Sequence, residues 1–355
     1  MNKFLKHSLT VILTGTVAIG TVSQSFGGND ERAGSSGASE ILINPWARST
    51  GWGSANCAGI RGLESQFLNV AGLAFTKKTE LLFSHTMWLK GSDVNINAFG
   101  ISQKVGQAGV IGLGLTSFSF GDIPVTTVEN PEGGIGTFSP QFLNIGLSYA
   151  KEFSNRIYGG ITVRVISESI SDAKASGVAF DAGIQYVTGF NADKDNLKFG
   201  ISLKNVGAPM KYSGDGLSYK GLSEAGTPLT IEYKAENYEL PSLINIGLMY
   251  DFKLAESQRL SAAFNFTANS FTRNQYALGL EYGFKSYLMI RSGYVFERDI
   301  FDDANRTTAL TGFCAGLTLE APLGKSGGRT IAFDYSFRAT DHFDGCHSFG
   351  ARINL

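Results

Sequence analysis

The sequence predicts an all-β fold: a single antiparallel transmembrane β-barrel of about 14 strands, preceded by an N-terminal plug. The first observation behind this prediction is an alternation of apolar and polar side chains from residue 79 to the C-terminus, which marks strands with two unlike faces. The second is that the polar face carries charges of both signs at mid-strand. The third is a charged fraction of only 17%, well below the roughly 25% of soluble domains.

Residues 331–339 show the pattern most clearly. Phe333 and Tyr335 lie on the apolar face of this stretch, and Asp334 and Arg338 lie on the other. Ionised side chains cannot enter a hydrophobic sandwich core without a large desolvation penalty. We therefore expect lipid to contact the apolar face and the charges to line an enclosed lumen. A soluble β-sandwich adhesin remains the alternative fold.

The chain begins like an exported protein. Lys3 and Lys6 give a basic start, residues 9–22 form an apolar run, and Ser25 supplies a small side chain. This arrangement is typical of a secretory signal cleaved after Ser25. The predicted organisation is a signal peptide over residues 1–25, an N-terminal hatch segment over 26–78 and an outer-membrane β-barrel over 79–355.

The segment of residues 26–78 is rich in Gly, Ser, Ala and Asn and lacks the alternation. A short helix is predicted near residues 63–68. Disordered leaders are poor in large apolar side chains, whereas this segment contains Ile41, Leu42, Trp46, Trp52, Phe67 and Leu68. We expect it to be a plug or hatch inside the barrel, for which lumen-facing glycines such as Gly112 and Gly114 make room.

Fourteen strand-like segments follow, an even number as is typical of membrane barrels. Aromatic side chains at their ends, such as Phe153 and Phe252, stand where interfacial girdles are expected. The predicted strands are 80–89, 93–105, 108–120, 141–153, 156–167, 177–188, 197–206, 242–252, 259–271, 275–284, 287–296, 308–321, 329–340 and 346–355.

Three connections are long: residues 121–140, 207–241 and 297–307. They follow the third, seventh and eleventh strands, so all three lie at one end of the barrel. Outer-membrane barrels keep short turns in the periplasm and long loops outside. We therefore expect a multi-pass outer-membrane barrel with both termini in the periplasm.

The sequence offers little chemistry for catalysis. The net charge of −1 argues against a nucleic-acid partner, and no Cys/His spacing suggests a metal or cofactor. Three cysteines do not form a disulfide scaffold, although a bridge through Cys57 stays open. His347 and Ser348 are adjacent, so they point to opposite faces of a strand and cannot form a nucleophile–base pair. We expect the protein not to be an enzyme.

Several short motifs follow one another in a specific order: Arg32-Ala33-Gly34, Ala47-Arg48 with Gly51-Trp52-Gly53, Asn69-Val70-Ala71-Gly72-Leu73-Ala74, the loop 121–139, and Leu203-Lys204-Asn205-Val206-Gly207. In this order they resemble the PorV/PorQ proteins of the Bacteroidetes, which are FadL-like barrels. The chain departs from that family's pattern at Val70, where proline is expected, and at Trp52, where methionine is common. The resemblance implies a FadL-like fold and a hatch motif of Asn69, Ala71 and Gly72.

The resemblance also implies a role in the type IX secretion system, whose export route serves gliding motility in related bacteria. Such a barrel would lie in outer-membrane lipid and bind exported proteins through their C-terminal signal domain, a translocon component, or both. Functional residues often lie on loops, and the predicted partner-binding residues are Thr127, Glu129, Asn130, Pro131, Tyr212, Tyr219, Tyr233, Tyr238 and Phe301. The alternative function is a FadL-like passive channel for hydrophobic small molecules, with the hatch as its gate. Which partner is held, and whether the lumen conducts, stay open.

Overall fold

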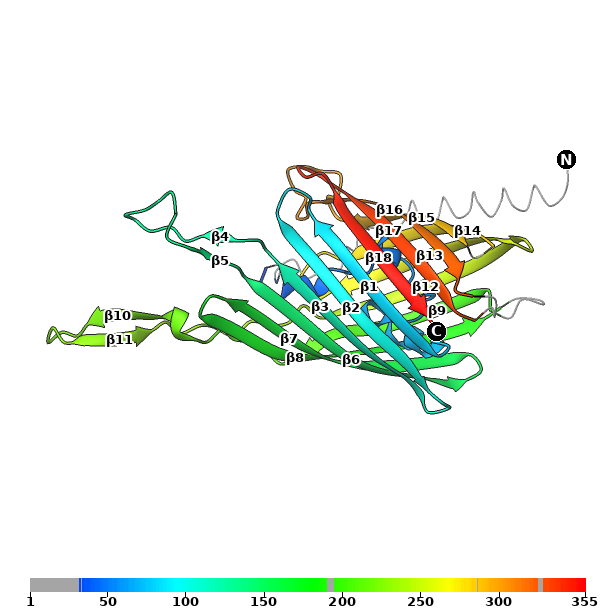
Figure 1. Ribbon diagram of the computed structural model, residues 1–355, viewed down its shortest axis with the longest axis horizontal. Helices are drawn as coiled ribbons and strands as arrows, with labels where there is room; N and C mark the ends of the chain where they lie inside the picture. The colour runs from blue at the N-terminus through cyan, green and yellow to red at the C-terminus, as the bar shows by residue number, and fades with distance from the viewer. Residues whose placement is uncertain (1–31, 33, 190–194, 286, 325–327) are drawn as a thin grey trace.

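The computed structural model describes residue 32 and residues 34–189, 195–285, 287–324 and 328–355. Its main feature is a closed barrel of fourteen antiparallel strands (Figure 1), in which β1 pairs with both β2 and β18. The predicted signal peptide, residues 1–25, lies outside the described residues. The barrel strands are β1 Thr79–Trp88, β2 Val94–Val105, β3 Gly109–Ser119, β6 Gln141–Ser154, β7 Ile157–Ile170, β8 Ala173–Thr188, β9 Leu197–Gly207, β12 Leu243–Ala255, β13 Gln258–Asn269, β14 Gln275–Phe284, β15 Leu288–Glu297, β16 Leu310–Pro322, β17 Thr330–Thr340 and β18 Cys346–Asn354.

The predicted barrel of about 14 strands is confirmed. The pairing of β1 with β18 closes the sheet, so the wall has no exposed edge. The largest difference from the prediction lies between β7 and β8, where the prediction leaves residues 168–176 outside strands. The ladder continues there as far as the pair Ile170–Ala173, and Ser171 in the remaining two-residue turn has a φ of 45°. Serine, alanine and lysine side chains obscure the apolar alternation in this stretch.

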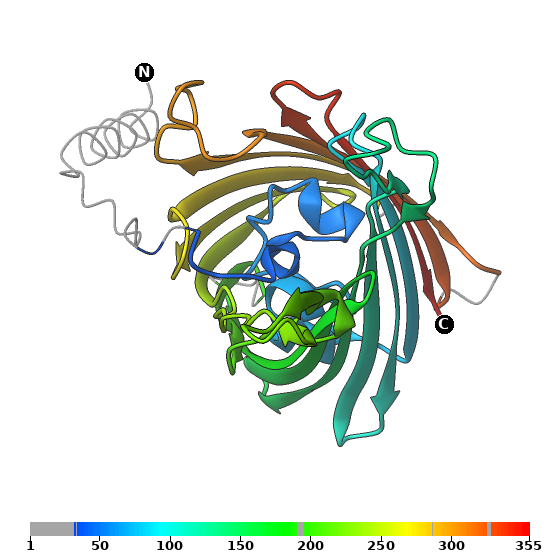
Figure 2. The same ribbon diagram turned by 90° about the vertical axis from the view of Figure 1, so that its left-hand side faces the viewer.

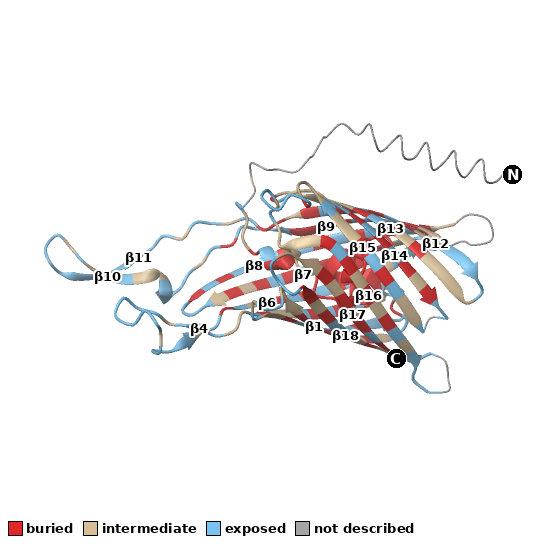
Figure 3. Cartoon of the chain, turned by 90° about the horizontal axis from the view of Figure 1, so that it is seen from above, coloured by how far each residue is buried: buried red, intermediate tan, exposed pale blue. Residues whose placement is uncertain are grey.

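Side chains alternate between the two faces of the wall, as predicted (Figure 3). On β17, Phe333 is 59% exposed, whereas Asp334 and Arg338 are 4% and 7% exposed. Large apolar side chains on the other strands are exposed in the same way, and the charges between them are buried. A soluble sandwich would show the reverse order, because its core could not hold these charges. The fold is therefore a membrane barrel and not that of a soluble adhesin.

The long connections leave the barrel at one end, since they follow β3, β9 and β15. Two of them contain a hairpin that the sequence did not predict: β4 (Ile123–Pro124) pairs with β5 (Thr137–Phe138), and β10 (Ser218–Leu222), preceded by η4 (Asp215–Leu217), pairs with β11 (Pro228–Glu232). Both hairpins project beyond the barrel strands in Figure 1. We call this end the hairpin end and the opposite end the turn end. Which of them faces the periplasm stays a prediction.

The three cysteines are buried side chains that form no disulfide. Cys57, Cys314 and Cys346 are free and buried, so the bridge through Cys57 that the sequence left open does not form. Among the described residues, no helix is long and apolar enough to cross a membrane.

Candidate functional site

Residues 34–78, here called the inner segment, lie inside the barrel (Figure 2). The segment contains short helical turns of four to six residues: η2 Ser39–Leu42, α2 Ala47–Thr50, α3 Ser65–Leu68 and η3 Val70–Phe75. The helix predicted near residues 63–68 corresponds to α3. Of the apolar anchors predicted from the sequence, Ile41, Trp46, Trp52, Phe67 and Leu68 are buried, and Leu42 is half-buried. The segment fills the lumen, while its role as a hatch stays a prediction.

Glycines on the inner face of the wall allow the inner segment to approach closely. A β-carbon added at Gly200 of β9 would lie 2.7 Å from the Cα of Ala58, and one at Gly100 of β2 would lie 2.5 Å from a methyl carbon of Leu63. Gaps this small exclude any side chain, which is a known use of glycine inside a strand. The other wall glycines that contact the inner segment in this way are Gly112, Gly114, Gly146, Gly160, Gly183, Gly247, Gly279, Gly293 and Gly316, whereas a β-carbon at Gly350 would have slightly more room.

The predicted hatch motif joins the inner segment to β8. The Asn69 Oδ1 atom accepts a hydrogen bond from the Ala71 amide at 3.2 Å, and its Nδ2 donates to the Ile184 carbonyl oxygen at 3.1 Å. A β-carbon at Gly72 would overlap the Ile60 carbonyl oxygen, so two limbs of the segment touch at this glycine. The motif thus connects the fold of the segment to its attachment on the wall.

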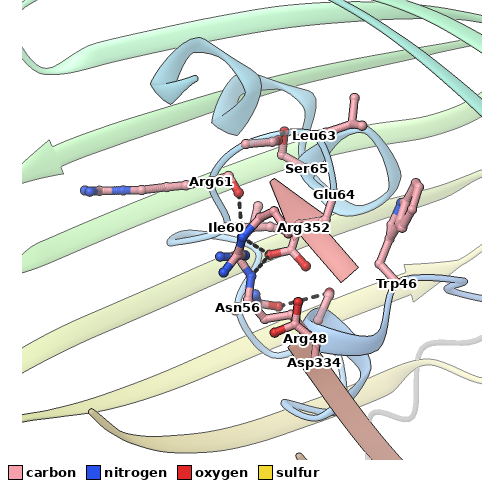
Figure 4. A network of polar contacts seen from close by, with 12 residues as sticks. Trp46, Arg48, Asn56, Ile60, Arg61, Leu63, Glu64, Ser65, Asp334 and Arg352 are labelled. Carbon is pink, nitrogen blue, oxygen red and sulfur yellow. Dashed lines mark hydrogen bonds and ion pairs between the residues drawn. The ribbon is translucent and has the colours of Figure 1, made fainter. Parts of the chain in front are cut away.

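Charged groups form a network on the turn side of the inner segment (Figure 4). Arg48 of α2 binds the Glu64 carboxylate and donates to the Arg61 carbonyl oxygen at 2.7 Å. On the wall, Glu80 of β1 accepts a hydrogen bond from the Leu63 amide at 3.0 Å. The network therefore links the inner segment to the barrel by charge-assisted hydrogen bonds, which are stronger than neutral ones.

The wall continues this network with ion pairs of its own: Lys198 with Asp251 at 2.5 Å, Arg291 with Glu281 at 2.6 Å and Arg352 with Glu320 at 3.1 Å. Two cavities of about 160 and 240 Å³ lie among these charges. Such surroundings suit water and ions and disfavour apolar solutes.

A cavity of about 210 Å³, here called the upper cavity, lies on the hairpin side of the inner segment. Phe67 and Leu68 of the inner segment and Ile300 of the connection between β15 and β16 line it. The wall contributes apolar, amide and charged side chains, among them Leu243, Asn245, Gln275, Val295, Glu297, Leu310, Lys204 and Arg338. This cavity is less polar than the two on the turn side and is the lumen's best candidate for binding an organic molecule.

The wall is irregular beside the upper cavity. The register of β16 against β17 shifts between Leu310 and Cys314, so residues 311–313 stand opposite the single residue Ala339. Gly312 has a φ of 94°, a conformation that glycine adopts without strain. Bulges of this kind bend a strand and interrupt its pairing. The hydrogen-bond ladder is thus broken where the cavity meets the wall.

Most of the predicted partner-binding residues are exposed at the hairpin end. Tyr219 and Tyr233 stack on the β10–β11 hairpin with ring centroids 4.8 Å apart. Phe301 is exposed and stacks on Tyr294 at 6.0 Å. The tip of the β4–β5 connection carries Thr127, Glu129, Asn130 and Pro131, all of them exposed. Their role in binding a partner stays a prediction.

Tyr212 and Tyr238 are placed differently, at the root of the β10–β11 hairpin. Their hydroxyls donate to Glu168 Oε2 of β7 at 2.5 and 2.8 Å, so both are already engaged within the protein. Burial and the neighbouring Glu168 carboxylate raise the pKa of Glu40, on η2 of the inner segment, to about 8. We call these four residues the latch, because they tie the hairpin root, the wall and the inner segment together.

Sequence reasoning found the lumen-facing charges individually and missed how they are grouped. Lys204 and Arg338 are recognisable from the alternation, but they meet at one cavity only because the barrel closes. The sequence near Glu40 and Glu168 does not mark either residue as functional. Glu40 lies in the irregular inner segment, and Glu168 lies near the end of β7, where the apolar alternation is weak. To predict that Lys204 and Arg338 share a cavity, or that Glu40 and Glu168 are neighbours, one would need to know how the strands pair with one another.

The adjacent residues His347 and Ser348 lie on opposite faces of the wall. His347 contacts the Tyr335 hydroxyl at 2.9 Å on the outer face, whereas Ser348 is buried on the inner face. The pair points to opposite faces, as the sequence predicted. Within the described part of the chain, no group of three or more His, Cys, Asp or Glu residues could hold a metal ion.

Comparison with known proteins gives the fold. No protein-family model matches this sequence, and no curated protein matches it either. The structure is similar to that of CymD, a monoaromatic hydrocarbon channel, with a TM-score of 0.51, 12% identity, and coverage of 88% of this chain and 97% of that chain. It is also similar to TodX, a toluene transporter of P. putida, with a TM-score of 0.52, 13% identity, and coverage of 87% and 96%. At these identities the likeness shows the fold alone, and the chain has the fold of a FadL-like outer-membrane β-barrel.

Proposed function

We propose that this protein is a passive outer-membrane channel for small hydrophobic molecules, with the inner segment as its hatch. The upper cavity is the observation that carries this proposal. Its volume is about 210 Å³, apolar side chains form part of its lining, and the inner segment separates it from the charged turn side. Small-molecule sites combine an apolar lining with a few placed polar groups in this way. The fold shared with a hydrocarbon channel and a toluene transporter agrees with this function.

Passage through the barrel requires the inner segment to move. Its helical turns are four to six residues long, and such short turns have little stability of their own. Local rearrangement of the segment therefore costs less free energy than separating paired strands. The interrupted ladder between β16 and β17 offers a second route, from the upper cavity sideways into lipid.

A disulfide that locks the inner segment to the wall tests the hatch. A β-carbon at Gly350 would lie 3.3 Å from that of Ala47, close to the roughly 3.5–4.5 Å of natural disulfides. We expect intact Gram-negative cells carrying the chain to take up radiolabelled toluene faster than cells without it. The oxidised Ala47→Cys/Gly350→Cys variant should lose this advantage, and a reductant should restore it.

The single variants Ala47→Cys and Gly350→Cys, treated with the same oxidant, are the controls. Uptake by the oxidised double variant at the wild-type rate would show that the inner segment is not a hatch. Equal uptake with and without the wild-type chain would remove the channel proposal itself.

Partner binding at the hairpin end, within the type IX secretion system, is the second candidate function. The two projecting hairpins and the exposed stack of Tyr219 on Tyr233 support it, because aromatic side chains are enriched at the centres of protein interfaces. The resemblance of the inner segment to the PorV/PorQ proteins points in the same direction.

Affinity purification from native outer membranes separates this candidate from the first. If it is right, a secreted C-terminal signal domain or a translocon component copurifies with the wild-type chain and is lost with Tyr219→Ala/Tyr233→Ala. Tyr287→Ala, an exposed tyrosine at the turn end, is the matched control. Recovery of neither kind of partner would remove this candidate.

A further inference from the structure

Among the residues that the structure describes, two buried lumen cations form no ion pair with a carboxylate. In the described part of the wall, Lys and Arg side chains are buried at six positions, and four of them form ion pairs: Arg164, Lys198, Arg291 and Arg352. Within the described part of the chain, Lys204 and Arg338 form none. The carboxylate of Asp181, whose charge acts on Lys204, is bound by Arg164 at 2.6 Å.

Arg338 is the more unusual of the two. Its partners in the ladder are Cys314 on β16 and Cys346 on β18, and neither offers a counter-charge. The guanidinium lies over the Trp88 ring at 4.6 Å, and its Nε and Nη2 atoms have no hydrogen-bond partner among the described residues. A buried charge without compensation is strongly destabilising. An unsatisfied buried group of this kind calls for an explanation, and a functional role is one.

Both cations line the upper cavity. The Lys204 ammonium lies 3.6 Å from the centre of the Phe67 ring, so the cation stands beside an aromatic face of the same cavity. Among the described residues that line it, the carboxylate is that of Glu297, whose Oε2 accepts a hydrogen bond from Gln275 at 2.9 Å. The described lining therefore contains two basic side chains and one acidic side chain.

The size of the cavity limits the ligand. A cavity of about 150 Å³ is enough for benzene, and the upper cavity measures about 210 Å³. A single ring with one small substituent fits this space. Leu243, Val295 and Leu310 provide apolar contacts for such a ring.

We infer that the upper cavity binds a small organic anion: a monocarboxylate with an aromatic or short aliphatic body. The Arg338 Nε and Nη2 atoms are unpaired and shielded from solvent, and a carboxylate that reaches them would satisfy both with its two oxygens. Lys204 adds a second basic group, and the apolar lining holds the body of the ligand. This inference rests on the proposed function, because it names the class of molecule that the channel would carry.

Titration calorimetry on the purified full-length chain in detergent micelles tests the site, with benzoate as the probe and toluene as its uncharged counterpart. We expect benzoate to bind the wild type at least about tenfold more tightly than toluene, and Arg338→Gln to weaken benzoate binding by about tenfold or more while leaving toluene unchanged. Arg259→Gln, on the turn side and outside this cavity, is the matched control and should bind benzoate like the wild type.

Thermal unfolding of the wild type and of Arg338→Gln distinguishes a binding role of this arginine from a purely structural one. Arg338→Gln removes a buried unpaired charge, so it should unfold at the same temperature as the wild type or above it. A purely structural arginine would instead give a less stable variant with unchanged benzoate binding. That result, or a wild type that binds toluene and benzoate equally, would overturn the inference.

Toluene uptake by cells tests the channel, and benzoate binding to the purified chain tests the anion site. Either proposal can therefore fail without the other. Uptake of toluene without benzoate binding leaves the channel in place and overturns the anion site. Benzoate binding by the wild type that Arg338→Gln weakens supports the anion site even where uptake is absent, and in that case the channel proposal is overturned.

Discussion

Glycine on the inner face of the wall is a packing residue in this barrel, because a side chain there collides with the inner segment. Alanine at Gly200 would place its β-carbon 2.7 Å from Ala58 Cα, and backbone atoms cannot move aside easily. We expect Gly200→Ala to lower the free energy of unfolding by about 1–3 kcal/mol. It should also make the inner segment more sensitive to protease. Thermal unfolding in micelles and limited proteolysis measure the two effects.

Gly136→Ala is the control for this substitution, since a β-carbon at Gly136 meets nothing within 4 Å. Equal stability of Gly200→Ala and Gly136→Ala would mean that the inner segment does not pack against β9.

Asn69 is the second residue on which the inner segment depends. Its side chain bonds the Ala71 amide and the Ile184 carbonyl oxygen, and truncation leaves both groups unsatisfied in a buried site. We expect Asn69→Ala to destabilise the protein by about 1–3 kcal/mol, measured by thermal unfolding. Asn155→Ala, at an exposed turn, should have little effect. A melting temperature of Asn69→Ala equal to that of Asn155→Ala would contradict the anchoring role.

Single residues also show where sequence reasoning stops. The alternation placed Asp334 and Arg338 correctly in the lumen, because facing direction depends only on the period of a strand. It could not show that Asp334 is bonded by Thr318 while Arg338 lies between two cysteines. Those relations depend on the register of three strands, which a single sequence does not contain.

At the scale of elements, the latch predicts a pH dependence. The pKa of Glu40 rises from its ordinary value of 4.5 to about 8, first because of burial and then because of Glu168, which also binds Tyr212 and Tyr238. The closed latch therefore favours the protonated carboxyl. Its stability is greatest below pH 4.5, falls as the pH rises toward 8, and is constant above that.

Hydrogen exchange at the hairpin root measures this dependence. The amides of Met210 and Tyr238 each donate to the other's carbonyl oxygen at 2.9 Å, and their protection, corrected for intrinsic exchange, should decrease between pH 5 and 8. Glu40→Gln should remove the dependence, because the amide cannot ionise. Glu239→Gln, an exposed carboxylate at the same root, should retain it. Protection independent of pH in the wild type would contradict the latch.

The elements differ in how well the sequence predicts them. Barrel strands were found because each has one face in lipid and one in the lumen, which imposes a regular alternation. The β4–β5 and β10–β11 hairpins were missed because both lie beyond the barrel, where no face needs to be apolar. Their composition of Gly, Pro and Thr looks like that of an ordinary loop.

For the whole molecule, the essential property is an inverted polarity: apolar side chains outside, charges inside, and a lumen filled by the inner segment. The sequence predicted the polarity and the filling from composition and alternation. The cavities on the two sides of the inner segment could not be predicted, because their linings come from many strands and from the inner segment at once.

Collision accessibility of spin labels tests this polarity most directly. Labels are attached to single cysteines in a background without native cysteines, at mid-barrel positions Phe333, Leu319 and Phe349 and at the hairpin positions Tyr219 and Leu222, all of which are exposed. In lipid bilayers, the mid-barrel labels should collide with oxygen, which concentrates in lipid, and should be shielded from an aqueous nickel chelate. The hairpin labels should show the reverse. Mid-barrel labels as accessible to the nickel chelate as the hairpin labels would contradict the membrane assignment and the functions built on it.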